Sequence, residues 1–199
     1  MAGIKIKPEE SALLLIDMQN EFLHEKGAFA QLGMWRFANE AKTIENTKKV
    51  ISLAHKAKIP VIYVRIVYRP GYPDVGETVP GKAMKDAEAC KKGSWGAEIV
   101  DELKPTPTDY IIEKRRVSAF YNTDLETLLR SLGRRTLIIA GVVTNFCVEG
   151  TVRSAVDRDF DVIVLADCTA STTKEAQEFA MKNIFPMLGR VATTEELII

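Results

Sequence analysis

The sequence contains few of the residues that build cross-linked or metal-dependent sites. It has three cysteines, an odd count with no Cys-x-x-Cys pair, and only two histidines, His24 and His55. A disulfide framework needs paired cysteines, and a histidine-rich metal centre needs imidazoles that lie close together. We therefore expect a reduced, cytoplasmic protein that works without a metal ion or another cofactor.

An excess of charge of one sign is also lacking. Lysine and arginine total 27, aspartate and glutamate total 27, and the net charge is +0. Nucleic acids and anionic membranes are bound through a net basic field or face. No apolar run reaches the roughly 18 residues that span a membrane, and the first residues, MAGIKIKPEE, are not typical of a secretory signal. We expect neither nucleic acid nor membrane as a partner.

Apolar runs that are typical of buried strands alternate with helical patterns along the chain. The runs occupy residues 12–16, 61–67, 110–112, 136–141 and 162–166, and apolar stripes at helical spacing occupy about 39–58, 125–132, 148–156 and 174–185. Runs that are apolar on both sides of the pleat suit central strands of a parallel sheet. The alternation therefore predicts an α/β fold, an open and mostly parallel sheet with helices on both faces.

One stretch interrupts this alternation. Residues from about 68 to 107 contain five of the eight prolines and no long apolar run. Because loops of this length are often functional, we interpret the stretch as an excursion over one edge of the sheet that acts partly as a lid. The remainder fits one domain that extends over residues 1–199.

Three chemically useful residues follow separate strands of the predicted sheet. Asp17 follows the first strand, Lys114 ends the third, and Cys147 comes after the fourth, at the expected start of a helix. Ligands of open α/β sheets bind beyond the carboxyl ends of the strands. There, a helix N-terminus and an ammonium stabilise a thiolate, and a carboxylate can carry its proton. The amides of the turn before Cys147 would then hold a developing oxyanion.

Each of these residues also has a common structural role. An aspartate that closes a strand is often a cap or turn residue, and a lysine at a strand end usually points into solvent. A cysteine within an apolar segment is usually an inert part of the core. Taken alone, the three residues leave both interpretations open.

Three segments resemble motifs of the isochorismatase-like cysteine hydrolases. They are LLLIDMQNEF around Asp17, EKRRVSAFYNTDL around Lys114 and AGVVTNFCVEGTVRSA around Cys147. The resemblance covers nearly the whole chain. It implies that Asp17, Lys114 and Cys147 form the family's catalytic triad on a six-stranded parallel sheet. It also implies a cis peptide bond between Val142 and Val143, an oxyanion hole formed by the amides of Val143 and Cys147, and a dimer or tetramer.

Differences between this sequence and particular branches of the family limit the reactions that we expect. Nicotinamidases bind a metal through histidines that are missing from VRIVYRPGYPD here, and isochorismatases proper, which hydrolyse a vinyl ether, lack the cysteine. The segment Gly93–Trp95, with VDELKP and RRVSAFYNTDL, most resembles the ureidoacrylate amidohydrolases, with biuret and N-carbamoylsarcosine hydrolases in the same neighbourhood. We therefore expect a cysteine-dependent amidohydrolase. It would cleave a C–N bond of a small amide, ureido or N-carbamoyl compound through a thioester and release ammonia.

Two other functions stay open. One is hydrolysis of an isochorismate-like vinyl ether, which needs the acid more than a thiol. The other is a non-catalytic, doubly wound domain that binds a nucleotide or a partner, although MQNEF stands where a glycine-rich phosphate loop would follow the first strand. Cys168, expected in a packed turn after a strand, is the alternative nucleophile, and Cys90 is expected to be an at least half-exposed bystander in a short helical patch.

Several residues are candidates for the wall of a substrate pocket. An asparagine would orient the acid or contact the substrate, and aromatic residues would form an apolar wall. The same aromatic residues could instead pack the core or hold their loops against the protein. The candidates are Asn20, Phe22, Tyr68, Trp95 and Tyr121.

Overall fold

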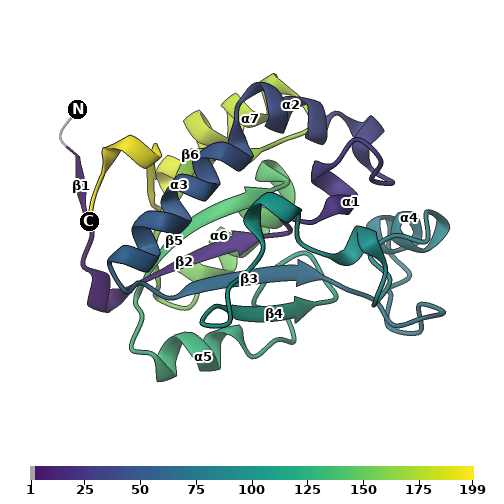
Figure 1. Cartoon of the computed structure of the whole chain (residues 1–199), viewed down its shortest axis with the longest axis horizontal. Helices are drawn as coiled ribbons and strands as arrows, with labels where there is room; N and C mark the ends of the chain where they lie inside the picture. The colour runs from purple at the N-terminus through teal and green to yellow at the C-terminus, as the bar shows by residue number, and fades with distance from the viewer. Residues whose placement is uncertain (1–2) are drawn as a thin grey trace.

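The computed structural model describes residues 3–199, and its centre is a six-stranded sheet in which every paired strand is parallel (Figure 1). The strands are β2 (Ser11–Ile16), β3 (Val61–Ile66), β4 (Tyr110–Lys114), β5 (Thr136–Val142), β6 (Asp161–Ala170) and β7 (Arg190–Ala192). Their order across the sheet is β4-β3-β2-β5-β6-β7. Two short strands, β1 (Ile4–Lys5) and β8 (Leu197–Ile198), pair separately. The predicted α/β class is confirmed.

The strands differ from the expected ones mainly at one edge of the sheet. β7 has only three residues, too few to produce an apolar run that sequence reasoning would detect. β6 does not stop at Ala166 but continues to Ala170, after a shift of register against β5. Cys168 therefore lies inside a strand, and the prediction of a turn there was wrong.

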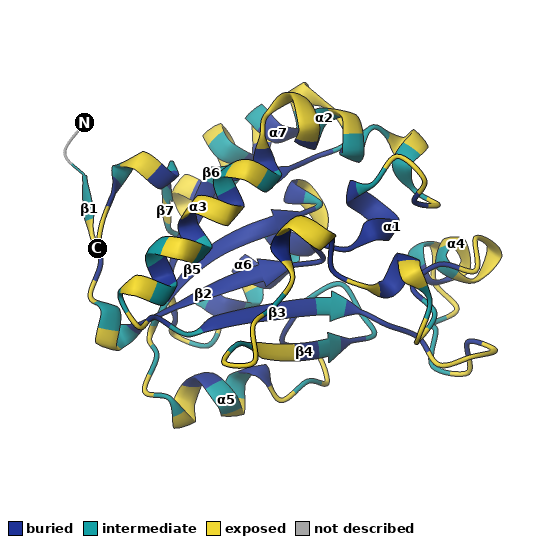
Figure 2. Cartoon of the chain, in the orientation of Figure 1, coloured by how far each residue is buried: buried dark blue, intermediate teal, exposed yellow. Residues whose placement is uncertain are grey.

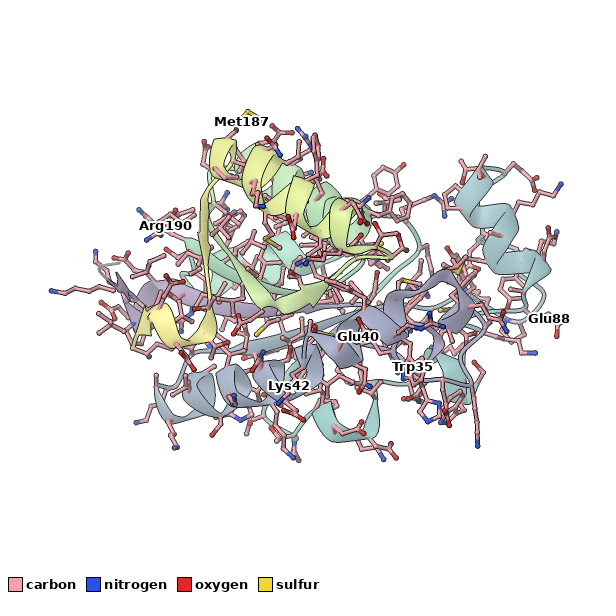
Figure 3. All side chains as sticks on the ribbon, turned by 90° about the horizontal axis from the view of Figure 1, so that it is seen from above. Trp35, Glu40, Lys42, Glu88, Met187 and Arg190 are labelled. Atoms are coloured by element: carbon pink, nitrogen blue, oxygen red, sulfur yellow. The ribbon has the colours of Figure 1, made fainter. Side chains whose placement is uncertain are left out.

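Seven α-helices connect the strands in the described part of the chain. They are α1 (Asn20–Leu23), α2 (Met34–Glu40), α3 (Thr43–Lys56), α4 (Val79–Asp86), α5 (Leu125–Ser131), α6 (Glu149–Val156) and α7 (Lys174–Phe179). The single helix expected over 39–58 was wrong, because the chain breaks at Lys42, whose φ of 55° is left-handed. Figure 3 labels Glu40, the last residue of α2, and Lys42 at the break. Within residues 3–199 no helix is long and apolar enough to cross a bilayer.

Alternate residues of the central strand face two different helical layers. Leu13 and Leu15 belong to an apolar cluster with residues of α2 and α3. Leu14 and Ile16 belong to a second cluster with residues of α5 and α6. Because both faces are covered, the strand is buried throughout, and Figure 2 shows β2, β3 and β5 buried between helices whose outer surfaces are exposed, whereas the edge strand β4 is partly exposed. Burial on both faces explains why residues 12–16 form a continuous apolar run and do not alternate between apolar and polar residues.

The stretch between β3 and β4 is held to the sheet at several points. Tyr68 forms a bridge with Lys91, and Gln19 forms one with Ile99. The fully buried Gln19 side chain also donates to the carbonyl of Ala97 at 2.9 Å. The expectation for Cys90 was wrong: it lies in the turn after α4, outside any helix, and is fully buried because it packs into the apolar cluster that contains Leu13 and Leu15.

A glycine in β5 allows the two central strands to meet beside the proposed site. Gly141 has a φ of +132°, and a Cβ atom there would lie 2.2 Å from the carbonyl oxygen of Ile16 in β2. Any side chain at this position would both strain its own backbone and displace the neighbouring strand. Because β2 and β5 come so close here, the residues that follow Ile16 lie next to the residues that follow Gly141.

We expect the substitution Gly141→Ala to lower the free energy of unfolding by about 3 kcal/mol, from backbone strain and overpacking combined. Gly133→Ala is the matched control, because Gly133 has a φ of +67° but a Cβ atom added there would meet nothing within 4 Å. That control should lose only about 1 kcal/mol. Urea unfolding followed by circular dichroism measures both, and equal losses would contradict the argument.

Candidate active site

Three side chains from separate strands meet at the carboxyl edge of the sheet. The Nζ of Lys114 lies 2.9 Å from Oδ2 of Asp17 and 3.6 Å from Sγ of Cys147. The side chains of Lys114 and Asp17 are 0% and 2% exposed, and Cys147 is also buried. An acid, an ammonium and a thiol therefore share one buried cluster, as expected from the ends of the strands.

The local backbone explains how each group reaches this point. Asp17 directly follows β2 in a left-handed conformation with a φ of 52°, and its amide donates to the carbonyl of Val64. Lys114 is the last residue of β4. Cys147 lies in a π-helical turn over Thr144–Val148, which precedes α6. We expected Cys147 to lie at the start of a helix. It lies instead in the turn that directly precedes α6.

A network of side chains holds the turn that carries the thiol. Thr144 donates from Oγ1 to Oε1 of Gln177 at 2.6 Å, and Gln177 in turn donates to the carbonyl of Thr169 in β6 at 3.3 Å. Ser171 donates to the side chain of Asn145 at 2.6 Å. The turn is therefore fixed against β6 from one side, while Lys114 contacts it from the other.

Burial and charge set the protonation of the cluster. Burial raises the pKa of Asp17 above its ordinary value of 3.8, although the ammonium of Lys114 opposes the shift. Burial alone would lower the pKa of Lys114, but Asp17 and Cys147 together hold it above 10.5. Burial also raises the pKa of Cys147 to about 12. At neutral pH the thiol keeps its proton, and beside it lies a carboxylate with an increased affinity for protons.

The two carboxylate oxygens of Asp17 have different surroundings. Oδ2 accepts the ammonium of Lys114. Oδ1 is buried and has no hydrogen-bond partner in residues 3–199. A buried carboxylate oxygen without a donor is costly, so this atom is well suited to accept a proton.

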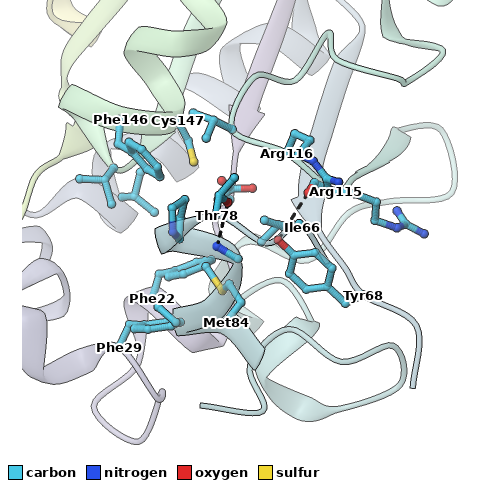
Figure 4. Close-up of a pocket in the computed structure, with 18 of the residues that line it drawn as sticks. Phe22, Phe29, Ile66, Tyr68, Thr78, Met84, Arg115, Arg116, Phe146 and Cys147 are labelled. Atoms are coloured by element: carbon cyan, nitrogen blue, oxygen red, sulfur yellow. Dashed lines mark hydrogen bonds between the residues drawn. The ribbon is translucent and has the colours of Figure 1, made fainter. Parts of the chain in front are cut away.

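A cavity of about 210 Å³ opens beside the cluster (Figure 4). Asp17 and Cys147 form part of its wall, together with Val142 and Val143, which are joined by a cis peptide bond. The rest is mainly apolar, with charge only from Asp17 and two arginines among the described residues. Its larger apolar side chains are Phe22, Phe29, Leu32, Met34, Ile66, Tyr68, Met84 and Phe146.

The structure brings two of the five expected pocket residues to this cavity, Phe22 and Tyr68. Asn20 does not line it, because its amide donates to the carbonyl of Trp95 at 2.9 Å and so holds the loop. The Trp95 ring packs edge-on against His24, away from the cavity wall. Tyr121 is 56% exposed and also lies outside the lining.

Sequence reasoning missed several lining residues. Phe29 and Met84 come from loops and short helices whose path depends on long-range contacts, so no local pattern indicates where their side chains point. Phe146 had a signal, since it precedes Cys147 directly. Arg116, two residues after Lys114, also lines the cavity.

The remaining cysteines lie outside the cavity lining. The Sγ of Cys168 is 3.2 Å from Oγ1 of Thr194, and Cys90 lies beneath the loop with its amide donating to Glu21. Neither lines the cavity. In residues 3–199 no group of three or more histidine, cysteine, aspartate or glutamate side chains has a geometry that could hold a metal ion.

We expect the substitution Lys114→Met to lower the free energy of unfolding by about 3 kcal/mol, because it leaves the buried Asp17 carboxylate without a counter-charge. The double substitution Asp17→Asn with Lys114→Met should lose less than the sum of the two single changes, since neither charge is then left unpaired. A double-mutant cycle in urea measures this coupling. Strictly additive losses would show that the pair does not interact.

The chain is similar in sequence and in structure to known proteins. A ureidoacrylate amidohydrolase, RutB, from Pseudomonas savastanoi pv. phaseolicola is 31% identical over 97% of this chain and 84% of its own length. The crystal structure of a cysteine hydrolase from Pseudomonas syringae pv. phaseolicola superposes with a TM-score of 0.86, at 30% identity over 96% of this chain and 92% of that chain.

An N-carbamoylsarcosine amidase from Thermoplasma acidophilum is similar too, with a TM-score of 0.76 and 29% identity over 94% of this chain and 97% of that chain. The isochorismatase domain matches residues 11–196. This span begins at β2 and ends beyond β7, so it includes the whole six-stranded sheet and the cluster at its carboxyl edge. On these grounds the chain belongs to the isochorismatase family.

Proposed function

We propose that this protein is a cysteine-dependent amidohydrolase that cleaves a C–N bond of a small amide, ureido or N-carbamoyl compound and releases ammonia. The observation that carries the proposal is the contact of Lys114 with both Asp17 and Cys147 at the wall of an apolar cavity. Relatives named as a ureidoacrylate amidohydrolase and an N-carbamoylsarcosine amidase support this substrate class. A volume of about 210 Å³ favours a small substrate.

In the first half of the reaction Asp17 accepts the proton of the Cys147 thiol, and the sulfur attacks the carbonyl carbon of the substrate. The ammonium of Lys114, next to both groups, stabilises the thiolate while it exists. The negative charge that develops on the carbonyl oxygen is held by the amides of Val143 and Cys147.

In the second half the C–N bond breaks and Asp17 returns its proton to the leaving nitrogen, so that ammonia departs and a thioester remains on Cys147. Water then attacks the thioester carbonyl and gives up a proton to Asp17. The C–S bond breaks, the acid product is released, and the proton returns to the sulfur. The raised pKa of Asp17 suits both directions of transfer.

The segment between β3 and β4 acts as the lid in this proposal. Thr78, Pro80 and Met84 of this segment line the cavity opposite the sheet edge. Closure over a bound substrate would exclude water from the thiolate. The lid belongs to a single domain over residues 1–199, and the protein is cytoplasmic and forms dimers or tetramers.

We expect Cys147→Ala to reduce ammonia release by at least about 10³-fold, because no other thiol of the described residues reaches the cavity. The assay screens ureido acids, biuret, nicotinamide and simple amides. Cys168→Ala and Cys90→Ala serve as matched controls, because both thiols are buried and outside the cavity lining, and both variants should stay active. If Cys147→Ala retained full activity, the thioester route would be excluded, and retained activity on a vinyl ether would favour the isochorismatase reaction.

We expect kcat/KM to fall about tenfold per pH unit on the acid side of an inflection above pH 3.8. The reaction needs Asp17 ionised, burial raises its pKa above 3.8, and kcat/KM reports the free enzyme. Lowering the pH through that pKa protonates the base and stops catalysis. The measurement is a pH profile of initial rates, with circular dichroism at each pH to separate titration from unfolding. An inflection at or below pH 3.8 would contradict the assignment.

A further inference from the structure

Nearly all of the surface that the wall turns toward the cavity is apolar. Phe22 and Phe29 form its aromatic part, with ring centroids 5.9 Å apart and 13° between the ring planes. Figure 4 shows Cys147 on one side of the cavity and Phe22, Phe29 and Met84 together on another. The part of a substrate that extends away from the reacting sulfur therefore meets hydrocarbon.

The two neutral hydroxyl groups of the lining already have partners in the protein. Oγ1 of Thr78 accepts from the amide of Gly81 at 3.3 Å, a bond that caps the first turn of α4. The hydroxyl of Tyr68 lies 3.5 Å from the main-chain carbonyl of Arg115, to which it donates. Both groups thus hold the connection between β3 and β4 and its surroundings in place.

The two arginines of the lining are held in a similar way by residues outside it. Arg115 donates from Nε to Oδ2 of Asp74 at 3.0 Å and forms a second ion pair with Glu113 at 3.4 Å. Arg116 donates from Nη1 to the main-chain carbonyls of Asp74 at 3.0 Å and Arg115 at 2.7 Å. Its guanidinium also packs against Gly76, where an added Cβ would lie 3.4 Å from Cζ and Nη2. These contacts explain why two cationic residues add so little polar surface to the wall.

The apolar surface continues to the mouth of the cavity. Leu32 and Phe146 both line it, and they are 57% and 43% exposed to solvent. Large apolar side chains that stay exposed at the rim of a cavity are typical of a ligand-binding groove. A ligand that covers them removes apolar surface from water, which favours its binding.

A carboxylate and an alkyl group of the same shape would fare differently in this cavity. The carboxylate would give up its hydration to a wall with few donors, which is costly. It would also approach the carboxylate of Asp17, whose charge Lys114 offsets. The alkyl group would leave water for an apolar surface and be stabilised by the transfer.

We propose that this enzyme acts on amides or ureides whose remaining part is an uncharged hydrocarbon group, and that it discriminates against carboxylates of the same shape. The inference rests on the proposed function and names the part of the substrate that this function leaves open. The hydrocarbon group packs against Phe22, Phe29 and Met84 when the carbonyl lies at Cys147. Ureidoacrylate and sarcosine carry carboxylates, so this preference would distinguish the protein from the relatives that are named after them.

The test compares ammonia release from amides that differ only at the end remote from the reacting carbonyl. One is 4-methylpentanamide, which ends in an isopropyl group, and the other is succinamate, in which a carboxylate replaces that group. We expect kcat/KM to be higher for 4-methylpentanamide by about 30-fold or more. The ureides 3-methylbutylurea and 3-ureidopropionate have the same two ends and should differ in the same direction. An equal or higher kcat/KM for the acid in either pair would overturn the inference and leave the amidohydrolase proposal intact.

The substitution Met84→Gln places a polar amide in the wall at nearly constant size. It should lower kcat/KM for 4-methylpentanamide by about tenfold, mostly through KM, and change that for succinamate by less than about threefold. Val79→Thr is the matched control, because Val79 is an exposed residue of the same helix outside the cavity lining, and it should change neither. Leu32→Asn at the mouth serves if Met84→Gln does not fold. Equal effects on both substrates in these variants would contradict apolar recognition.

Calorimetric titration of both amides into Cys147→Ala separates this inference from the proposed function, because it measures binding without turnover. Tighter binding of 4-methylpentanamide, with a negative heat-capacity change, supports the apolar site even if no substrate releases ammonia. Equal affinity, a tighter succinamate or no detectable binding of 4-methylpentanamide would overturn it, whatever the activity of the unmodified enzyme.

Discussion

The buried ammonium of Lys114 is the constraint on which the site depends. A charge taken out of water at this depth is tolerated only if every proton finds an acceptor. Here the acceptors are the carboxylate of Asp17, the sulfur of Cys147 and the carbonyl of Arg116. They follow three different strands, so satisfying one ammonium fixes the positions of three loop segments. The same requirement that stabilises the charge also brings the carboxylate, the ammonium and the thiol together.

The cavity has walls of two different kinds. One side consists of residues at the ends of strands, which the parallel sheet holds rigidly. The other side comes from the long connection between β3 and β4, and the side chain of Gln19 is one of the links between the two. Gln19 accepts from the amide of Ile66 at 2.8 Å and donates to the carbonyls of Ile66 and Ala97 at 2.9 Å. Because Gln19 is two residues from Asp17, the loop and the acid share an anchor.

Much of this arrangement could be predicted from the sequence, and the reasons differ from element to element. Apolar runs marked five of the six strands because central parallel strands are buried on both faces, and the strand ends placed Asp17, Lys114 and Cys147 at one edge. The edge strand β7 is too short to leave a pattern. The break at Lys42 left no pattern in the sequence either. The apolar stripe continues across it, and only the left-handed backbone of Lys42 separates the two helices.

The pocket was predicted less well because its wall is made by contacts distant in sequence. Phe22 and Tyr68, the two candidates that do line the cavity, follow β2 and β3 within a few residues, so the sheet limits where they can lie. Trp95 and Tyr121 were expected in the wall because they are aromatic residues in loops, but the loops turn them outward. Nothing local distinguishes Arg115, whose charge is balanced by Asp74, from Arg116, whose charge is not. That difference exists only in three dimensions.

The glycine pair above Arg116 bears on how such a chain can diverge. A Cβ on Gly81 would lie 2.0 Å from the carbonyl oxygen of Gly76, so the first turn of α4 rests directly on main chain. A side chain at Gly81 would therefore push the first turn of α4 away from Gly76, whereas a Cβ on Gly76 would meet only the side chain of Arg116, at 3.4 Å. A cavity for larger substrates would therefore require changes in side chains of α4 that line it, such as Met84, or an insertion or deletion in the connection between β3 and β4.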